Sequence, residues 1–206
     1  MNHATNAAVI YYSATGTTYQ MAVEAAQSAE EAGAETRLRK VRELAPEEAI
    51  RSNSGWHAHR LETQDVPEAQ LDDLDWANVV IFGTPTRYGV MAAQLKQFLD
   101  SSGPLWAQGK LVNKVFAGFC STATAHGGQE ATLLSMFNVF YHWGGIVVTP
   151  GYVDPSQFAA GNPYGASHTS NNGEVPPDAT ALTATRLTAQ RAVEISRALK
   201  HGLVPA

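Results

Sequence analysis

The sequence has 206 residues, of which 44% are hydrophobic and 16% are charged. A chain of this length can bury a full core without disulfides or metals, and we expect a single domain over residues 1–206. Nineteen acidic and fourteen basic side chains give a net charge of −5. This argues against sequence-independent nucleic-acid binding, which needs a basic surface. The charged fraction is below the roughly 25% of typical soluble domains, which predicts large buried or subunit-facing surfaces.

The sequence also carries no sign of a membrane or metal partner. No stretch approaches the ~20 apolar residues that a membrane helix needs, and residues 1–8 lack the basic and apolar segments of a secretory leader. The single cysteine, Cys120, excludes an internal disulfide and a cysteine-based zinc site, and we expect it to be a small buried side chain. His57 and His59 lie two positions apart without recognisable further ligands. We therefore expect a cytoplasmic protein without a bound metal.

Five segments have the composition of strands. Residues 7–12, 78–83, 114–119 and 146–149 are short runs rich in apolar residues, as in strands buried on both faces of a parallel sheet. Residues 36–41 alternate Leu38 with charged residues, which predicts a strand nearer the edge of the sheet.

Apolar residues at helical spacing lie between and after these strands. Four helices are predicted: residues 21–32 with Gly33 as the stop, residues 92–99, residues 133–140, and about residues 178–200. Strands that alternate with helices predict a flavodoxin-like α/β fold, a doubly wound parallel sheet of five strands with helices on both faces. Two long connections, 43–76 and 152–177, remain as loops that we expect to be functional.

The loop after the first predicted strand can bind a phosphate group. It offers backbone N–H groups, the positive end of the following helix dipole and several hydroxyl donors, while Gly16 allows close approach. The residues are Ser13, Ala14, Thr15, Gly16, Thr17 and Thr18. They include no Lys or Arg, so the site would be a neutral nest for a small phosphate monoester. An ordinary helix cap is the alternative.

Two further loops follow predicted strands and are expected at the same edge of the sheet. Residues 83–89 predict a tight loop in which Arg87 and Tyr88 could line a planar heterocycle, although a surface turn is equally compatible. Residues 121–130 form a loop of small residues. Three loops that converge at strand ends favour a cofactor site more strongly than any one of them does. Neither a G-x-G-x-x-G fingerprint nor a P-loop is present.

Several of these motifs together resemble the WrbA family of flavodoxin-like NAD(P)H:quinone oxidoreductases that bind FMN. The resemblance runs from about Ala7 to the last helix. The matching segments are Tyr11–Ser13 with Gly16, Phe82–Gly89, Phe98–Asp100, Leu105–Trp106, Gly128–Glu130 and Asn162–Ala166. Thr15 stands where the family usually has an aromatic residue, and Ala123 and Ala125 replace glycines of the third loop.

The resemblance implies a set of site residues. FMN would contact the phosphate loop from Ser13 to Thr18, the second loop at Pro85, Thr86, Arg87 and Tyr88, and the third loop at Ser121, Thr122, Ala123, Thr124, Ala125 and Gly127. His142 matches the family's histidine near the flavin, and Trp106 matches its substrate-side tryptophan. His142 and Arg87 are the catalytic candidates. Each has a structural alternative: an ion pair for Arg87, core or interface packing for Trp106, and a helix cap for His142.

The implied activity is a two-electron reduction of quinones by NADH or NADPH. A hydride would pass to flavin N5, and quinone would then take the place of the oxidised nicotinamide in a ping-pong cycle. Family members are typically tetramers with active sites completed across subunits, so we expect a homotetramer. The alternatives are a flavodoxin-type one-electron carrier, for which a charge of −5 is mild, and a non-enzymatic regulatory partner, which no motif supports.

Overall fold

The computed structural model describes residues 5–202, so the first four residues of the N-terminal segment discussed above lie outside it. Five parallel strands form the sheet in the order β2-β1-β3-β5-β6. Their bounds are β1 (Thr5–Tyr11), β2 (Ala34–Lys40), β3 (Val79–Arg87), β5 (Val115–Thr122) and β6 (Ile146–Val147). This order confirms the predicted flavodoxin-like doubly wound sheet, with β2 at an edge.

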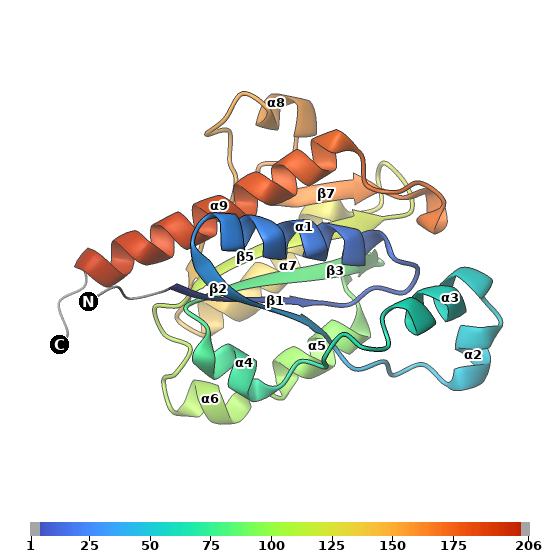
Figure 1. The fold of residues 1–206 in the computed structure, drawn as a ribbon, viewed down its shortest axis with the longest axis horizontal. Helices are drawn as coiled ribbons and strands as arrows, with labels where there is room; N and C mark the ends of the chain where they lie inside the picture. The colour runs from blue at the N-terminus through green and yellow to red at the C-terminus, as the bar shows by residue number, and fades with distance from the viewer. Residues whose placement is uncertain (1–4, 203–206) are drawn as a thin grey trace.

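Helices cover both faces of the sheet (Figure 1). The long helices α1 (Thr17–Glu31) and α9 (Ala179–Gly202) pack together on one face. The other face carries α4 (Leu71–Trp76), α5 (Ala93–Asp100), α6 (Gly103–Ala107) and α7 (Gln129–His142). Alternate residues of β1 enter two separate cores, Val9 on the α1 side and Ile10 on the α5 and α7 side. No described helix is both long and apolar enough to cross a membrane.

Two short strands pair with β5 where the sequence predicted one strand at residues 146–149. β6 contains only Ile146 and Val147 of the predicted residues 146–149 and pairs with the first half of β5. A second strand, β7 (Ala166–Thr169), pairs with the second half of β5. The connection 152–177 is therefore not simply a loop, because it contains the short helix α8 (Gln157–Ala160), β7 and a 3₁₀ turn, η1 (Asn171–Gly173).

The connection 43–76 is likewise more ordered than expected. It folds into α2 (Glu47–Arg51), α3 (Ser54–Glu62) and α4. α2 has five residues and α3 nine, too few for helical periodicity to stand out in the sequence. The side chain of Asn53 caps α3 by accepting a hydrogen bond from the backbone N–H of Trp56 at 3.0 Å.

The expected tight loop at residues 83–89 is instead the end of a strand and a hairpin. β3 continues to Arg87 and pairs antiparallel with β4 (Val90–Met91). Tyr88 and Gly89 form its two-residue turn with φ values of 54° and 80°. Two consecutive positive φ values match the type I′ turn, whose twist suits two-residue hairpins.

Gly83 allows β3 and β5 to pack at the strand end next to this hairpin. A Cβ atom on Gly83 would lie 2.2 Å from Cζ of Phe119, whose side chain is fully buried. We expect Gly83→Ala to lower the free energy of unfolding by about 1–3 kcal/mol, because the ring must move within a close-packed core. Urea unfolding measures this change.

Gly103→Ala is the matched control for this prediction, since nothing lies within 4 Å of a Cβ atom at Gly103 and its φ is not positive. We expect the control to retain wild-type stability within about 0.5 kcal/mol. Equal stabilities of the two variants would show that Phe119 moves aside without cost and that the packing at Gly83 is not tight.

Candidate functional site

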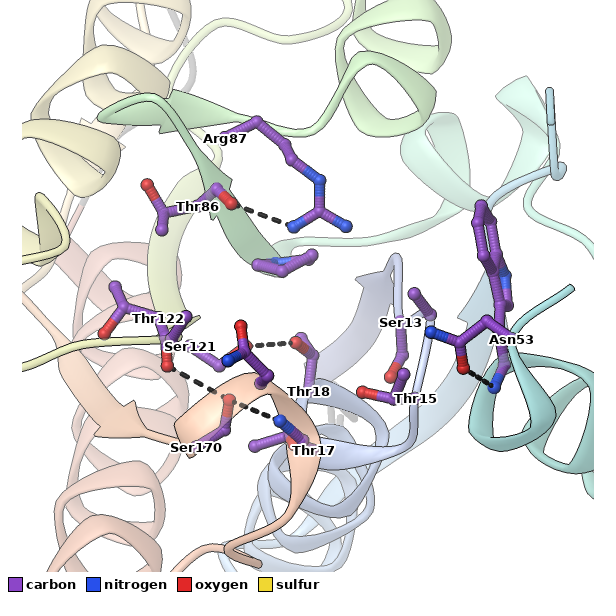
Figure 2. A pocket seen from close by; sticks show the side chains of 16 residues that line it. Ser13, Thr15, Thr17, Thr18, Asn53, Thr86, Arg87, Ser121, Thr122 and Ser170 are labelled. Carbon is purple, nitrogen blue, oxygen red and sulfur yellow. Dashed lines mark hydrogen bonds between the residues drawn. The ribbon is translucent and has the colours of Figure 1, made fainter. Parts of the chain in front are cut away.

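A cavity of 340 Å³ lies at the edge of the sheet where β1, β3 and β5 end. Figure 2 shows the hydroxyl side chains of the first loop facing Arg87 across this opening. The cavity is lined by Ser13, Ala14, Thr15, Thr17, Thr18, Asn53, Trp56, Pro85, Thr86, Arg87, Ser121, Thr122, Ala123, Ser170, Asn172 and Gly173. The structure thus brings residues of all three predicted loops together.

The first loop ends in an uncapped helix. Gly16, at φ 101°, precedes α1 in a left-handed conformation, and no side chain caps the N-terminus of the helix. The backbone N–H of Gly16 donates to Oγ of Ser13 at 3.1 Å, which closes the loop. The start of α1 is therefore free of an internal acceptor, as an anion site requires. Buried Thr18 joins this loop to the third one through a 2.9 Å hydrogen bond between its hydroxyl and that of Ser121.

The hairpin between β3 and β4 presents Arg87 to the cavity and turns Tyr88 away. Thr86 fixes the hairpin, since its hydroxyl lies 2.7 Å from that of Thr132 in α7 and accepts from the N–H of Gly89 at 3.2 Å. Arg87 is exposed and donates to the carbonyl of Thr86 at 2.9 Å. Tyr88 is fully exposed and does not line the cavity, so the structure does not place its ring at the pocket wall.

The third loop contributes its first half to the cavity and its second half to structure. Ser121, Thr122 and Ala123 line the cavity, whereas Thr124, Ala125 and Gly127 do not. The buried side chain of Gln129 donates to the carbonyls of Thr124 and Ala125 at 3.4 Å and 3.1 Å. The carbonyls of the second half therefore face the start of α7. Gly16 is also absent from the lining, since it is buried behind its neighbours.

The two long connections supply lining residues that sequence reasoning missed. α3 and the residue before it contribute Trp56 and Asn53, and the segment after β7 contributes Ser170, Asn172 and Gly173. Ser170 joins that segment to β5 by donating its N–H and hydroxyl to the carbonyl of Thr122 at 2.7 Å and 3.0 Å. The length of both connections was the only signal in the sequence. Individual residues carried none.

Glu43 holds Trp56 in the wall of the cavity. Its carboxylate accepts from Nε1 of Trp56 at 3.1 Å, from the hydroxyl of Tyr12 at 2.9 Å and from Nε2 of Gln94 at 2.8 Å. The N–H groups of Leu44 and Ala45 donate to the same carboxylate. Burial alone would raise the pKa of Glu43, but these hydrogen bonds outweigh it and the net shift is downward. An ionised carboxylate therefore links the residue after β1 with α3 and α5 behind the cavity.

Trp106 and His142 do not lie in the cavity of their own chain. Nε1 of Trp106 donates to the backbone carbonyl of His142 at 3.0 Å, so the two residues form one exposed unit. α7 begins beside the third loop and reaches His142 after 14 residues, about 20 Å along the helix.

The charge in the cavity is sparse. Of the described residues that line it, Arg87 is the one with a formal charge at pH 7. Within residues 5–202, no three His, Cys, Asp or Glu side chains gather in a way that could hold a metal ion. Cys120 is fully buried, and burial raises the pKa of its thiol far above the ordinary value. This confirms its prediction as a small buried side chain.

We expect Glu43→Gln to lower the free energy of unfolding by about 1–3 kcal/mol at pH 7, because an amide cannot accept from all five donors. The pKa of Glu43 is lower in the folded state, so the carboxylate stabilises the protein above its unfolded pKa of about 4.3. This advantage disappears as the pH falls through the folded pKa. Urea unfolding between pH 7 and pH 3.5 should therefore show the difference in stability between the two proteins becoming smaller once the pH falls below the unfolded pKa.

The exposed Glu48 in α2 provides the control variant Glu48→Gln, which should match the wild type throughout this pH range. A constant difference between wild type and Glu43→Gln down to pH 3.5 would contradict the role of the ionised carboxylate.

Comparisons with known proteins identify the family. The sequence model of the family described as NADPH-dependent FMN reductase matches residues 6–160. A protein of Deinococcus radiodurans named NAD(P)H dehydrogenase (quinone) is 47% identical over 165 residues, covering 80% of this chain and 82% of that protein. One of the same name from Paracoccus denitrificans is 40% identical over 206 residues, covering 96% and 97%.

Solved structures agree with these relatives. The crystal structure of a WrbA-like flavodoxin from Agrobacterium tumefaciens superimposes with a TM-score of 0.67 at 27% identity, covering 95% of this chain and 99% of that one. An archaeal flavodoxin at 16% identity has a TM-score of 0.60 and shares the fold, with coverage of 93% and 99%. The chain therefore belongs to the NADPH-dependent FMN reductase family, as a protein of the WrbA type.

Proposed function

We propose that this protein is an FMN-dependent oxidoreductase that reduces quinones with NADH or NADPH. The observation that carries the proposal is the convergence of three strand-end loops on one cavity beside the uncapped start of α1. Two of the relatives are named as quinone dehydrogenases that use NAD(P)H, which supports the same substrates for this protein.

The lining residues fit FMN in their chemistry. A phosphate monoester would meet the hydroxyls of Ser13, Thr15 and Thr17 and the free N–H groups of the first turn of α1. Trp56 and Pro85 provide apolar walls for a planar ring system in the same cavity. A volume of 340 Å³ lies within the range of small-molecule sites. We propose that the lining residues of the three predicted loops bind FMN.

FMN bound here would supply hydride chemistry at N5: it would accept a hydride from NAD(P)H and pass a hydride to quinone, and one further proton from solvent would complete the hydroquinone. Because donor and acceptor would use the same face of one cavity, we propose ping-pong kinetics. Arg87, whose guanidinium is exposed at the rim, would stabilise negative charge that develops on the reduced cofactor. A cytoplasmic location would give the protein access to NAD(P)H.

We further propose that Trp106 and His142 act in the cavity of a neighbouring copy within a homotetramer. One chain holds them together but away from its own cavity. Large apolar side chains are exposed nearby and elsewhere, including Tyr141 at 59% and Phe158 at 73%, as expected of surfaces that contact other subunits. Trp106 would form an apolar wall for the flat substrate. His142 would hydrogen-bond to the substrate or the flavin, or help to deliver a proton.

Anaerobic stopped-flow spectroscopy tests the proposed function. The FMN-loaded protein should lose its flavin absorbance fully on mixing with NADH or NADPH and regain it promptly with benzoquinone. Thr17→Asp places a carboxylate at the start of α1 and should abolish FMN retention by repelling the phosphate. Unchanged FMN affinity in this variant would refute the assignment of the phosphate loop.

The same stopped-flow experiment distinguishes a quinone reductase from the alternative function of a one-electron carrier. If neither NADH nor NADPH reduces the bound flavin, and chemical reduction gives a stable one-electron-reduced flavin, the protein is a flavodoxin-type electron carrier.

Mixed oligomers test whether the site is shared between subunits. Thr17→Asp should lack FMN, and Trp106→Ala should raise the quinone KM. In a mixed oligomer, an intact cavity of a Trp106→Ala subunit can receive Trp106 from a Thr17→Asp neighbour. We expect co-refolded mixtures to recover a fraction of sites with wild-type KM. Light scattering of each protein reports its oligomeric state. Kinetics equal to the sum of the separate variants would place Trp106 outside a shared site.

A further inference from the structure

His59 lies directly behind the phosphate loop. Its imidazole belongs to α3 and is only 5% exposed. A Cβ atom on Gly16 would lie 3.5 Å from Nδ1 of His59, so the ring packs against the backbone at the turn between β1 and α1. Figure 1 shows α3 beside that turn. Because Gly16 has no side chain, the imidazole can lie close to the backbone of the loop.

This position matters because the loop itself has no cation. Residues 13–18 contain neither Lys nor Arg, and Arg87 reaches the cavity from the opposite rim in Figure 2. A phosphate dianion in such a cradle would be held by neutral donors and the helix dipole alone. A titratable group packed on the outer side of Gly16 is therefore well placed to supply the missing positive charge.

The surroundings of His59 permit both of its protonation states. The ring faces a second cavity of 270 Å³, which shares Ser13 and Trp56 with the first. On its own helix, Oε2 of Glu62 lies 3.5 Å from Nδ1. Tyr19 of α1 packs on the ring with centroids 5.3 Å apart. The other ionisable groups that line this cavity are Tyr11, Tyr12, Lys40, Arg42, Glu43, Arg60 and Glu68.

Burial, Glu62 and Lys40 influence the pKa of His59. Burial lowers the pKa of His59, the nearby Glu62 carboxylate opposes this effect, and Lys40 adds to it, so the net shift is downward. Tyr11 lines the same cavity, and its buried hydroxyl has no hydrogen-bond partner among the described residues. The imidazole is thus neutral near pH 7 by itself, with polar groups close by that tolerate its protonation.

We propose that His59, packed behind the phosphate loop, takes up a proton when the phosphate of FMN enters the loop and thereby stabilises the bound dianion through its charge. The inference rests on the proposed FMN site. The ligand it recognises is the phosphate group, and the isoalloxazine ring plays no part. A phosphate dianion beyond Gly16 adds a favourable interaction with the imidazolium, so binding and protonation strengthen each other.

The test compares FMN affinity of wild type and His59→Gln between pH 5.5 and pH 8.5 by quenching of flavin fluorescence. At a pH above the pKa of His59 in both the free and the FMN-bound protein, wild type and His59→Gln should bind FMN equally. As the pH falls, the wild type should bind increasingly more tightly than the variant, by about tenfold for each unit of pKa rise on binding. Protonation of FMN itself affects both proteins and cancels in their ratio.

Riboflavin and a second variant keep the result interpretable. Riboflavin lacks the phosphate, so its affinity should differ little between wild type and His59→Gln at any pH. His57→Gln, on the same helix but lining neither cavity, should match the wild type. Equal loss of FMN and riboflavin affinity at every pH would make His59 a structural residue and overturn the inference. A ratio of FMN affinities between wild type and His59→Gln that does not change with pH would also overturn the inference. Absence of FMN binding in the wild type would instead refute the proposed function.

Discussion

The parallel register of the central strands is the constraint on which the site depends. Tyr11 of β1 lies beside Gly83 of β3, and Gly83 lies beside Phe119 of β5, so the following loops open at one edge. Because Gly83 has no side chain, the ring of Phe119 occupies the space that a Cβ atom at position 83 would take. A shift in this register would separate the phosphate loop from the hairpin that carries Arg87. Packing within the sheet therefore determines the shape of the cavity.

The sequence predicted the parts of the fold that have strong periodicity. The strands β1, β3 and β5 and the long amphipathic helices were predicted correctly because each continues its pattern over several residues. The strands that were missed are short: β4 has two residues and β7 has four, and of the strand predicted at residues 146–149 only Ile146 and Val147 are paired. Trp56 and Asn172 could not be predicted as lining residues, since α3 and η1 approach the cavity only through tertiary contacts. The hydrogen bond from Trp56 to Glu43 links residues that no local pattern connects.

Thr15 shows how the cavity accommodates a departure from the resemblance. Its family counterpart is usually aromatic, and in this chain the turn after β7 packs against the smaller side chain. A Cβ atom on Gly173 would lie 2.4 Å from Oγ1 of Thr15, and Asn171, Asn172 and Gly173 all have positive φ values. Three consecutive residues in the left-handed conformation are rare, and glycine adopts this conformation with the least steric strain. The small residue at position 15 and the tight turn are therefore mutually dependent features of this chain.

Charge placement divides the site into regions with different tasks. The donors around Gly16 are neutral, so the proposed phosphate site carries no fixed positive charge. Arg87 lies exposed on the hairpin rim, where its positive charge keeps its hydration and, under the proposed function, would stabilise negative charge that develops in the cavity. Glu43 lies behind Trp56 with its carboxylate saturated by five donors, so its negative charge is offset by local dipoles. Negative charge in the cavity is therefore most favourable toward Arg87 and least favourable toward the wall formed by Trp56.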